Sequence, residues 1–326
     1  MSASRSRLYR SGVLERENLS VAEATRHLTD PAVTLWLDID APTAADLATL
    51  TTELGLHPLA VASVLDEDHQ RPKLVHYDHH SFLAAYAVRF DPGTGVLAAS
   101  ELDAFVTDRV LVTLHRNNTA DIDALTERWD STPELAKTGT GFLLHGLLDL
   151  LVDGHFDALQ TLDEQVEELE DLVFADEADA TDLQRRSLRL RKSLSRLRHL
   201  ALPMREIVSS LMRREVRTVD DTLLPYFQDV YDHVLRVTEW TESLRDLIAT
   251  VRETQLSIQG NRLNTIMKKV TSWAAIIAVP TAITGFYGQN VPYPGFAQAS
   301  GVWVSTVAIL VISATLFVLF KRRDWL

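Results

Sequence analysis

A stretch of 51 residues near the C-terminus, positions 270–320, contains no Asp, Glu, Lys, Arg or His. The chain as a whole is rich in charge, since 24% of its 326 residues are Asp, Glu, Lys or Arg. A helix crosses the ~30 Å hydrocarbon core of a bilayer with roughly 20 residues, so this stretch is long enough for two spans. Glycines and prolines at 288–295 predict a turn between them. We therefore predict a membrane protein with spans at about 270–287 and 302–320.

Basic residues flank the two predicted spans on one side only. Lys268 and Lys269 precede the first span, and Lys321, Arg322 and Arg323 follow the second. Cytoplasmic flanks of membrane helices carry an excess of Lys and Arg. We therefore expect a multi-pass protein of a bacterial-type inner (plasma) membrane, with both termini cytoplasmic and the 288–301 loop outside. No apolar segment follows the polar, basic first ten residues, so we expect no signal peptide.

The composition excludes several other classes of protein. The chain has no cysteine, which excludes a disulfide-stapled scaffold and a zinc site built from thiolates. Its net charge of −13 argues against nucleic acid as a partner. The sequence contains no Walker A loop and no His-Glu-x-x-His pattern. We therefore expect neither an enzyme nor an organic cofactor.

Residues 1–140 alternate short apolar runs with helical stretches, which predicts a cytoplasmic α/β domain. The predicted strands are 34–39, 81–90, 97–106 and 110–115, and the predicted helices are 43–56 and 121–129. This order predicts a mixed or antiparallel sheet.

Residues 141–269 are predicted to form a helical hairpin and a long stalk helix. From about residue 142 the strand pattern ends, and glycine and proline become scarce. Positions 157–182 hold eleven acidic residues, and positions 185–198 hold seven basic ones. We predict that these opposite charges face each other across the hairpin, although each exposed pair stabilises it little. Weak attraction of cations by the acidic run is the alternative.

The stalk helix is predicted to lead directly into the first span. Pro225 suits a helix start, and no other proline occurs before Pro280. An unbroken helix from Pro225 to Gly285 has 61 residues, which corresponds to about 90 Å at 1.5 Å per residue. One small domain cannot bury its apolar stripe, so the helix needs neighbours. It would carry cytoplasmic movement into the membrane.

The two spans of the 270–326 membrane domain differ in composition. The second is rich in Val, Ile, Leu and Phe and is typical of a lipid-facing helix. On the helix of the first span, seven residues at spacings of three and four share one face: Asn264, Met267, Thr271, Ala274, Ala278, Thr281 and Gly285. A face of small and hydroxyl-bearing residues can line a pore or pack against another helix, and the periodicity alone favours packing.

The outer end of the first span carries the sequence Gly288-Gln289-Asn290. In this position it resembles the signature of the CorA family of divalent cation channels, which have Gly-Met-Asn or a related Gly-x-Asn after the first of two C-terminal spans. Further matching segments are Leu-His-Pro-Leu-Ala at 56–60, His-Gln-Arg-Pro-Lys at 69–73, Pro-Tyr-Phe-Gln-Asp-Val-Tyr-Asp-His at 225–233, positions 264–268 and Pro280-Thr281. The resemblance therefore covers the chain from about residue 50.

The resemblance implies an α+β membrane protein that assembles as a funnel-shaped homopentamer, with the first span around the pore. Its partners would be copies of itself, membrane lipid and divalent cations. The resemblance favours pore lining as the role of the seven-residue face. It implies that Asn264 and Thr281 form polar rings and that Met267 lies in an apolar constriction that gates by dewetting.

Gly288, Gln289 and Asn290 are the candidate selectivity filter. Mg²⁺ gives up its water reluctantly, and a ring of neutral amide oxygens at Asn290 can hydrogen-bond the hydrated ion. The alternative is that these residues serve only the turn.

Asp229 matches a family position that implies regulatory Mg²⁺ binding between subunits. Bound Mg²⁺ would hold a closed state, and its loss would leave like charges repelling each other; a solvated surface acid is the alternative. Two departures from the family pattern stand out. Gln289 replaces Met in the signature, and Ala62-Ser63 occupies the position of an acidic pair, with the acids Asp66, Glu67 and Asp68 following.

The leading functional hypothesis is a Mg²⁺ channel that also admits Co²⁺ or Ni²⁺, driven by the membrane potential and gated by cytoplasmic Mg²⁺. The first alternative is Zn²⁺ transport like that of the ZntB branch, with coupling to protons. The second is a membrane-anchored cytoplasmic scaffold or enzyme that conducts no ion. Oligomeric state separates the last hypothesis from the others, because two spans alone cannot enclose a pore.

Overall fold

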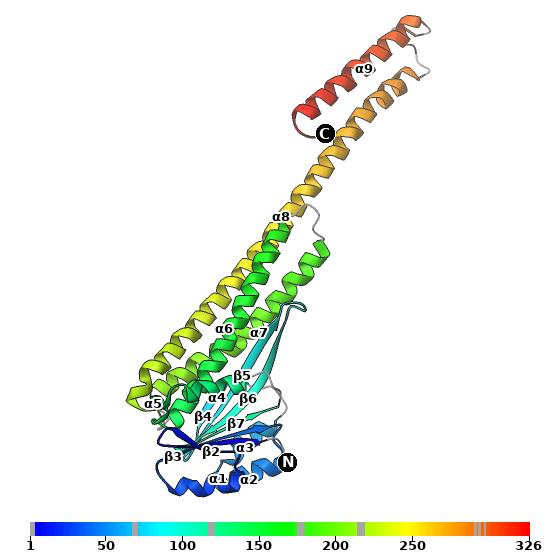
Figure 1. Cartoon of the computed structure of the whole chain (residues 1–326). Helices are drawn as coiled ribbons and strands as arrows, with labels where there is room; N and C mark the ends of the chain where they lie inside the picture. The colour runs from blue at the N-terminus through cyan, green and yellow to red at the C-terminus, as the bar shows by residue number, and fades with distance from the viewer. Residues whose placement is uncertain are drawn as a thin grey trace. The chain divides into compact units, whose positions relative to one another are not determined.

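A computed structural model of the chain describes residues 4–66, 71–116, 121–174, 180–213, 219–289, 292, 295–296 and 298–326 (Figure 1). The chain divides into two compact units, Met1–Val251 and Arg252–Leu326.

The first unit is built on a seven-stranded sheet with the order β2-β1-β3-β7-β6-β5-β4. Its strands are β1 (Ser4–Arg10), β2 (Val13–Glu17), β3 (Val33–Asp40), β4 (Lys73–His76), β5 (Ser81–Asp91), β6 (Val96–Val106) and β7 (Val110–His115). The β3–β7 pair is parallel, and the other pairs are antiparallel. The prediction of a mixed sheet is confirmed, and the four predicted strands are β3, β5, β6 and β7. The sequence patterns missed the strands β1, β2 and β4.

Helices cover both faces of this sheet (Figure 1). The first group is α1 (Val21–Arg26), the short 3-10 turn His27–Thr29, α2 (Ala44–Leu54) and α3 (Pro58–Leu65); the second is α4 (Ile122–Asp130), α5 (Pro133–Ala136) and α6 (Thr140–Val173). Alternation along β3 separates the two cores, because successive strand side chains point to opposite faces. Leu35 and Leu37 lie in the core with α2 and α3, whereas Trp36 lies in the core with α4 and α6.

Local signals explain where the short helices begin and end. Thr43 accepts from the Asp46 backbone N–H, and the Asp46 side chain bonds back to Thr43, so the pair forms a capping box at the start of α2. Gly55 ends this helix in the left-handed region, with φ of 67°. Pro58 lies in the first turn of α3, where its missing N–H leaves no helix bond unmade.

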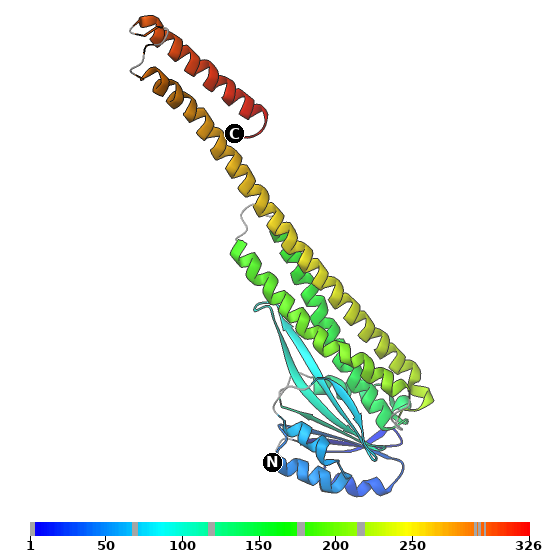
Figure 2. The same cartoon turned by 180° about the vertical axis from the view of Figure 1, so that it is seen from behind.

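Three long helices, α6, α7 (Ala180–Met212) and α8 (Leu224–Tyr287), carry the helical part predicted from residue 142 onward. The 3-10 turn Asp221–Leu223 precedes α8, whose 64 residues run unbroken as predicted. Figure 2 shows α6 and α7 lying along the β5–β6 hairpin. Leucines and valines of α6, α7 and the first half of α8 form one core, including Leu162, Leu194 and Leu244.

The opposite charges of α6 and α7, predicted to face each other, approach at a cavity lined by Glu168 of α6 and by Arg186 and Arg189 of α7. Among the described residues of these helices, no ion pair joins α6 to α7. Instead, Arg198 of α7 pairs with Glu242 of α8 at 2.8 Å, and Arg186 pairs with Asp182 of its own helix at 2.8 Å. The helices pack through their apolar stripes, which leaves most of their charges facing water.

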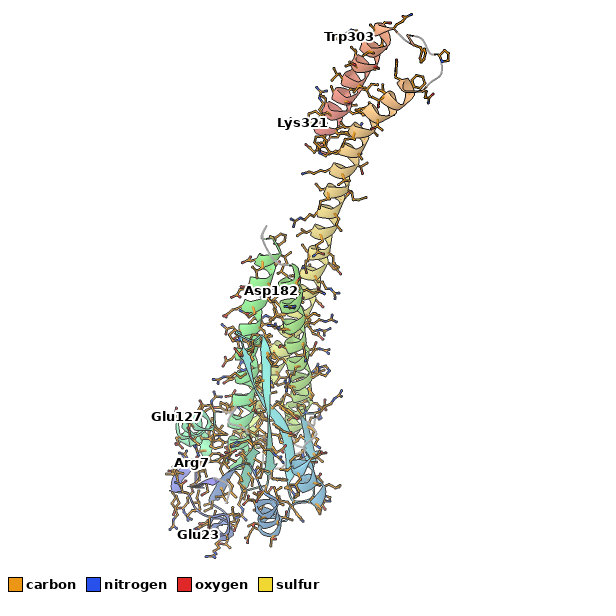
Figure 3. All side chains as sticks on the ribbon, turned by 90° about the vertical axis from the view of Figure 1, so that its right-hand side faces the viewer. Arg7, Glu23, Glu127, Asp182, Trp303 and Lys321 are labelled. Atoms are coloured by element: carbon orange, nitrogen blue, oxygen red, sulfur yellow. The ribbon has the colours of Figure 1, made fainter. Side chains whose placement is uncertain are left out.

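The second unit contains the end of α8 and α9 (Ala299–Arg322), and both helices are long and apolar enough to cross a membrane. Their most apolar windows have mean hydropathies of 1.4 and 2.4. The rings of Trp273 on α8 and Phe317 on α9 lie 6.5 Å apart, so the two helices pack together. Trp303 and Lys321 lie at opposite ends of α9 (Figure 3), as aromatic and basic anchors of a span do.

Gly146 controls how closely α4 packs on α6. A Cβ atom at this position would lie 2.4 Å from Nε1 of Trp129, which is buried on α4. We expect Gly146→Ala to destabilise the first unit by about 1–3 kcal/mol, because the ring of Trp129 has to move. Thermal unfolding of the full-length protein in detergent measures this loss as a lower Tm.

Gly154→Ala is the matched control on the same helix. Its added Cβ would lie 3.7 Å from the nearest atom, an ordinary contact. Replacing a helical glycine by alanine is expected to stabilise the helix by up to about 1 kcal/mol. Equal melting temperatures for the two variants would contradict the proposed role of Gly146.

Candidate ion pathway and metal-binding residues

The seven residues predicted to share a face of α8 are all exposed in the single chain. Met267, for example, is 65% exposed. We call this set the predicted pore face: Asn264, Met267, Thr271, Ala274, Ala278, Thr281 and Gly285. At 3.6 residues per turn it is centred about half a turn from the side of α8 that packs against α9. That side is marked by Ser272, which is fully buried, and by the partly buried Ile283.

The predicted pore face therefore has no partner within the described part of the second unit. A Cβ atom added at Gly285 would meet nothing within 4 Å. The Thr281 hydroxyl donates to the Ile277 carbonyl at 3.1 Å, which leaves its oxygen lone pairs free to accept. Small side chains, an amide and hydroxyl oxygens thus line an accessible stripe of the helix.

The C-terminal end of α8 closes in a tight turn at the proposed filter. The Gly288 N–H donates to the Thr284 carbonyl at 2.8 Å, and the Gln289 N–H donates to the Phe286 carbonyl at 3.3 Å. A Cβ atom at Gly288 would lie 3.1 Å from the Thr284 oxygen, so glycine suits this turn. Asn290 lies outside the described residues, and its role in the filter stays a prediction.

Glycines also hold the outer loop against the start of α9. Gly295 has a φ of 92°, in the left-handed region that favours glycine. A Cβ atom on Gly301 would lie only 2.6 Å from the Gly295 carbonyl oxygen. This close approach of two backbones fixes the position where the loop meets the second span.

Asp229, the predicted regulatory ligand, lies on α8 close to a group of polar residues on α6. His145, Asp149 and Asp153 are spaced by four along α6, so they form one stripe of that helix. The charge of Asp229 acts on His145. Possible ligand atoms of Asp149, Asp153 and His233 all lie within 4.8 Å of one another, and the three side chains are half-buried.

Arg128 of α4 is the counter-charge of this group. It forms ion pairs with Asp149 and, at 2.8 Å, with Asp153. Burial raises the pKa of Asp149, and the neighbouring Asp153 raises it further. Burial also lowers the pKa of His145, which favours the neutral ring. The cluster is thus rich in acid groups that a cation would stabilise in their ionised form.

The donor set suits a divalent cation. Two carboxylates with bound waters are sufficient for Mg²⁺, and an added imidazole nitrogen also suits Co²⁺, Ni²⁺ or Zn²⁺. A cation here would share the two carboxylates with Arg128 or displace its side chain. Sequence reasoning missed Asp149, Asp153 and His233. The available signal was the four-residue spacing of polar groups in the otherwise apolar start of α6.

Ala62 and Ser63 stand where the family pattern has an acidic pair, and Ser63 makes a different kind of contact there. Ser63 accepts a hydrogen bond from Lys73 Nζ at 3.3 Å. Of the acids that follow, Asp66 lies just after α3, and Glu67 and Asp68 lie outside the described residues. Asp66 lines a cavity on the sheet, together with Glu101 and Asp103 of β6.

The sequence of this chain is similar to those of known metal transport proteins along nearly its whole length. The cobalt/magnesium transport protein CorA of Thermotoga maritima is 28% identical over 307 residues, which cover 93% of this chain and 87% of that protein. The divalent cation transporter CmaX of Pseudomonas aeruginosa is 26% identical over 303 residues, covering 91% and 89%.

The fold is that of a solved full-length transporter. The complete structure of the CorA magnesium transporter from Methanocaldococcus jannaschii superposes with a TM-score of 0.82 at 22% identity, covering 100% of this chain and 99% of that one. The sequence model of the family described as "CorA-like Mg2+ transporter protein" matches residues 31–322. The resemblance seen in the sequence is confirmed, and the chain belongs to the family of CorA-like Mg²⁺ transporter proteins.

Proposed function

We propose that this chain carries Mg²⁺ across a cell membrane through a pore that several copies of α8 enclose. The exposed predicted pore face carries this proposal. Two spans cannot surround a pore, so copies of the chain must combine around a symmetry axis, and the family resemblance favours five. The unpartnered face of α8 then turns inward, and α9, with its exposed Val302, Trp303 and Leu310, faces lipid.

The proposed pore is lined by neutral side-chain oxygens rather than by charged groups. No acidic, basic or histidine residue occurs at 270–320. Rings of Thr281 and Asn264 oxygens can hydrogen-bond the water shell of an ion without stripping it. Met267 supplies an apolar ring between the two polar rings.

The driving force is the membrane potential together with the ion's own gradient. Moving one elementary charge through 100 mV contributes about 2.3 kcal/mol, and a divalent ion gains twice that. Proton-coupled Zn²⁺ transport is disfavoured by the same neutral spans. They contain no carboxylate or imidazole to carry a proton across the membrane. Co²⁺ and Ni²⁺, close to Mg²⁺ in charge and size, are further cargo.

The group around Asp229 is proposed as the cytoplasmic Mg²⁺ sensor. It lies on α6 and α8, and α8 is the helix that becomes the first span. Cation binding to Asp229, Asp149 and Asp153 favours the conformation that brings these acids together. When the ion is lost, these acids repel one another and α8 can move. Both termini are cytoplasmic in this arrangement.

The test of transport is ion entry into liposomes that contain the purified protein and a trapped Mg²⁺-sensitive dye. We expect voltage-driven Mg²⁺ entry that ignores a proton gradient and falls at least tenfold in Asn290→Ala. A tenfold fall corresponds to about 1.4 kcal/mol in the barrier. Ser300→Ala, in the same outer region, is the control. Zn²⁺ entry that follows the proton gradient, or no flux from folded protein, would overturn the proposal.

Two threonines of α8 test which face lines the pore. The Thr281 and Thr284 hydroxyls each donate to the carbonyl four residues earlier, at 3.1 and 2.8 Å. Replacing either by valine keeps the shape and removes one hydroxyl. We expect Thr281→Val to slow Mg²⁺ entry about tenfold, a barrier change of about 1.4 kcal/mol. We expect Thr284→Val, about a sixth of a turn from Thr281 and outside the predicted pore face, to leave Mg²⁺ entry unchanged. The opposite result would assign the pore to another face.

Asp229→Asn tests the sensor. With Mg²⁺ trapped inside the liposomes, flux through the native protein is expected to be inhibited. The variant should need at least tenfold more internal Mg²⁺ for the same inhibition, because one ligand charge is lost. Asp232→Asn is the control, since this exposed acid on the same helix bonds to Gln228 rather than to the α6 stripe. Unchanged Mg²⁺ sensitivity of Asp229→Asn would remove Asp229 from the sensor.

A further inference from the structure

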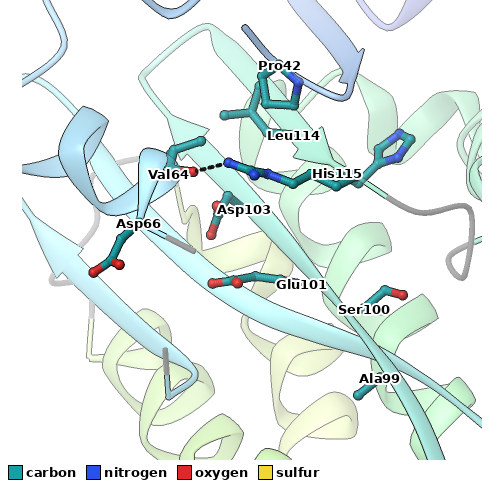
Figure 4. Close-up of a pocket in the computed structure, with 10 residues that line it drawn as sticks. Pro42, Val64, Asp66, Ala99, Ser100, Glu101, Asp103, Leu114 and His115 are labelled. Atoms are coloured by element: carbon teal, nitrogen blue, oxygen red, sulfur yellow. Dashed lines mark hydrogen bonds between the residues drawn. The ribbon is translucent and has the colours of Figure 1, made fainter. Parts of the chain in front are cut away.

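A cavity of about 240 Å³ lies on the face of the sheet that α2 and α3 cover. Its wall includes Glu101 and Asp103 of β6, Asp66 after α3, and Arg116 at the end of β7. Figure 4 shows the carboxyl groups of Asp66, Glu101 and Asp103 arranged around this space. None of these residues has a role in the proposed pore or sensor.

Asp103 is the unusual member of the wall. It is only 7% exposed, and its Oδ1 atom is buried with no hydrogen-bond partner among the described residues. Its direct neighbours across the sheet are Ala84 of β5 and Leu114 of β7, neither of which offers a polar side chain. A buried carboxyl oxygen without a partner is destabilising, so its presence beside a cavity points to an occupant.

The neighbouring groups define the charge of that occupant. Glu101 lies two residues before Asp103 and therefore on the same face of β6, and the Tyr86 hydroxyl lies against its carboxylate. The Arg116 guanidinium donates to the Val64 carbonyl at 2.9 Å. Among the described residues of the wall, the carboxyl groups of Asp66, Glu101 and Asp103 and the guanidinium of Arg116 sum to −2 when all four are ionised, which matches a divalent cation. His115 also lines the cavity, and its ring pairs with Asp38 at 3.2 Å.

The electrostatics of Asp103 agree with this geometry. Burial raises the pKa of Asp103 to about 8, and the nearby Glu101 charge contributes to the rise, while Lys73 and Arg116 oppose it. The two acids of β6 thus resist being ionised together. A divalent cation between them removes that conflict, because it favours both charged forms.

We propose that this cavity binds a hard divalent cation, such as Mg²⁺ or Mn²⁺, through the carboxylates of Asp103 and Glu101, with Asp66 at its edge. Mg²⁺ commonly keeps several waters and takes only one or two carboxylates from a protein. Six waters occupy about 180 Å³ at ~30 Å³ each, so the cavity has room for the ion with its water shell. Arg116 also lines the cavity and adds a positive charge to its wall.

The site is separate from the Asp149, Asp153 and His233 cluster. Leu102 and Ala104, the residues that alternate with Glu101 and Asp103 on β6, lie in the core shared with α6. Glu101 and Asp103 therefore point away from α6, to the other face of the sheet. The proposal does not depend on the pore, and the protein could fail to transport Mg²⁺ and still bind an ion here.

The test counts bound Mn²⁺ on the full-length protein in detergent, by equilibrium dialysis with paramagnetic resonance of the free ion. We expect Asp103→Asn to bind one Mn²⁺ fewer per chain than the native protein. An ion on the pore axis is shared between copies, so a loss of one ion per chain distinguishes this cavity from the pore. Excess Mg²⁺ should displace this Mn²⁺, and excess Na⁺ should not.

Asp108→Asn is the matched control. Asp108 is an exposed acid in the turn that follows β6, so the change removes the same charge outside the cavity. We expect this variant to bind as many Mn²⁺ ions as the native protein. Equal Mn²⁺ counts for Asp103→Asn and the native protein would overturn the proposal and leave Asp103 as a buried protonated acid.

Glu101→Gln keeps the test decisive if Asp103→Asn fails to fold. It keeps the shape of the side chain, removes one of the two proposed ligand charges, and should weaken Mn²⁺ binding at this site at least tenfold. Thermal unfolding without metal identifies a folded variant. A folded Glu101→Gln protein with native Mn²⁺ counts and affinity would likewise contradict the site.

Discussion

The main physical constraint on this protein is that its two charge-free helices must satisfy their backbone hydrogen bonds and cover their apolar surface. A segment inside a bilayer must satisfy every backbone N–H and C=O itself, which leaves the helix as the choice for each span. The two helices differ in the side chains on their surfaces. Helix α9 has a surface of branched and aromatic side chains that suit lipid. Helix α8 has one side packed on α9, and its other side is small, polar and uncovered. In the proposed function, this uncovered side turns towards the axis around which copies of the chain assemble.

The distribution of charge divides the tasks between the two units. Carboxylates occur in the first unit, where Asp149, Asp153, Glu101 and Asp103 are partly or fully withdrawn from water. There a bound cation would favour the ionised forms of neighbouring acids. The spans contain only neutral oxygens, which hold a hydrated ion weakly enough to pass it on. In the proposed function, sensing and conduction thus use opposite chemistry in one chain.

The sheet and the three long helices form a base on which these sites are built. The two faces of the sheet lie in separate cores, so neighbouring residues of one strand serve different parts of the molecule. On β6, Leu102 and Ala104 bind the sheet to α6, while Glu101 and Asp103 open onto the cavity. On α6, the apolar residues bind the sheet and α7, while the stripe from His145 to Asp153 meets α4 and α8. Alternation and helical periodicity produce this division.

The sequence by itself determined the two spans, the long unbroken α8, four central strands and the position of the signature turn, because each depends on local periodicity, length or missing charge. It also contained the predicted pore face. Tertiary structure decided which side of α8 meets α9, and it brought Asp149 and Asp153 of α6 to His233 of α8, some eighty residues away. It alone showed that Asp103 is buried beside a cavity, and that no ion pair joins the described residues of α6 to those of α7. Such facts depend on strand order and on packing between distant segments, and local patterns do not encode them.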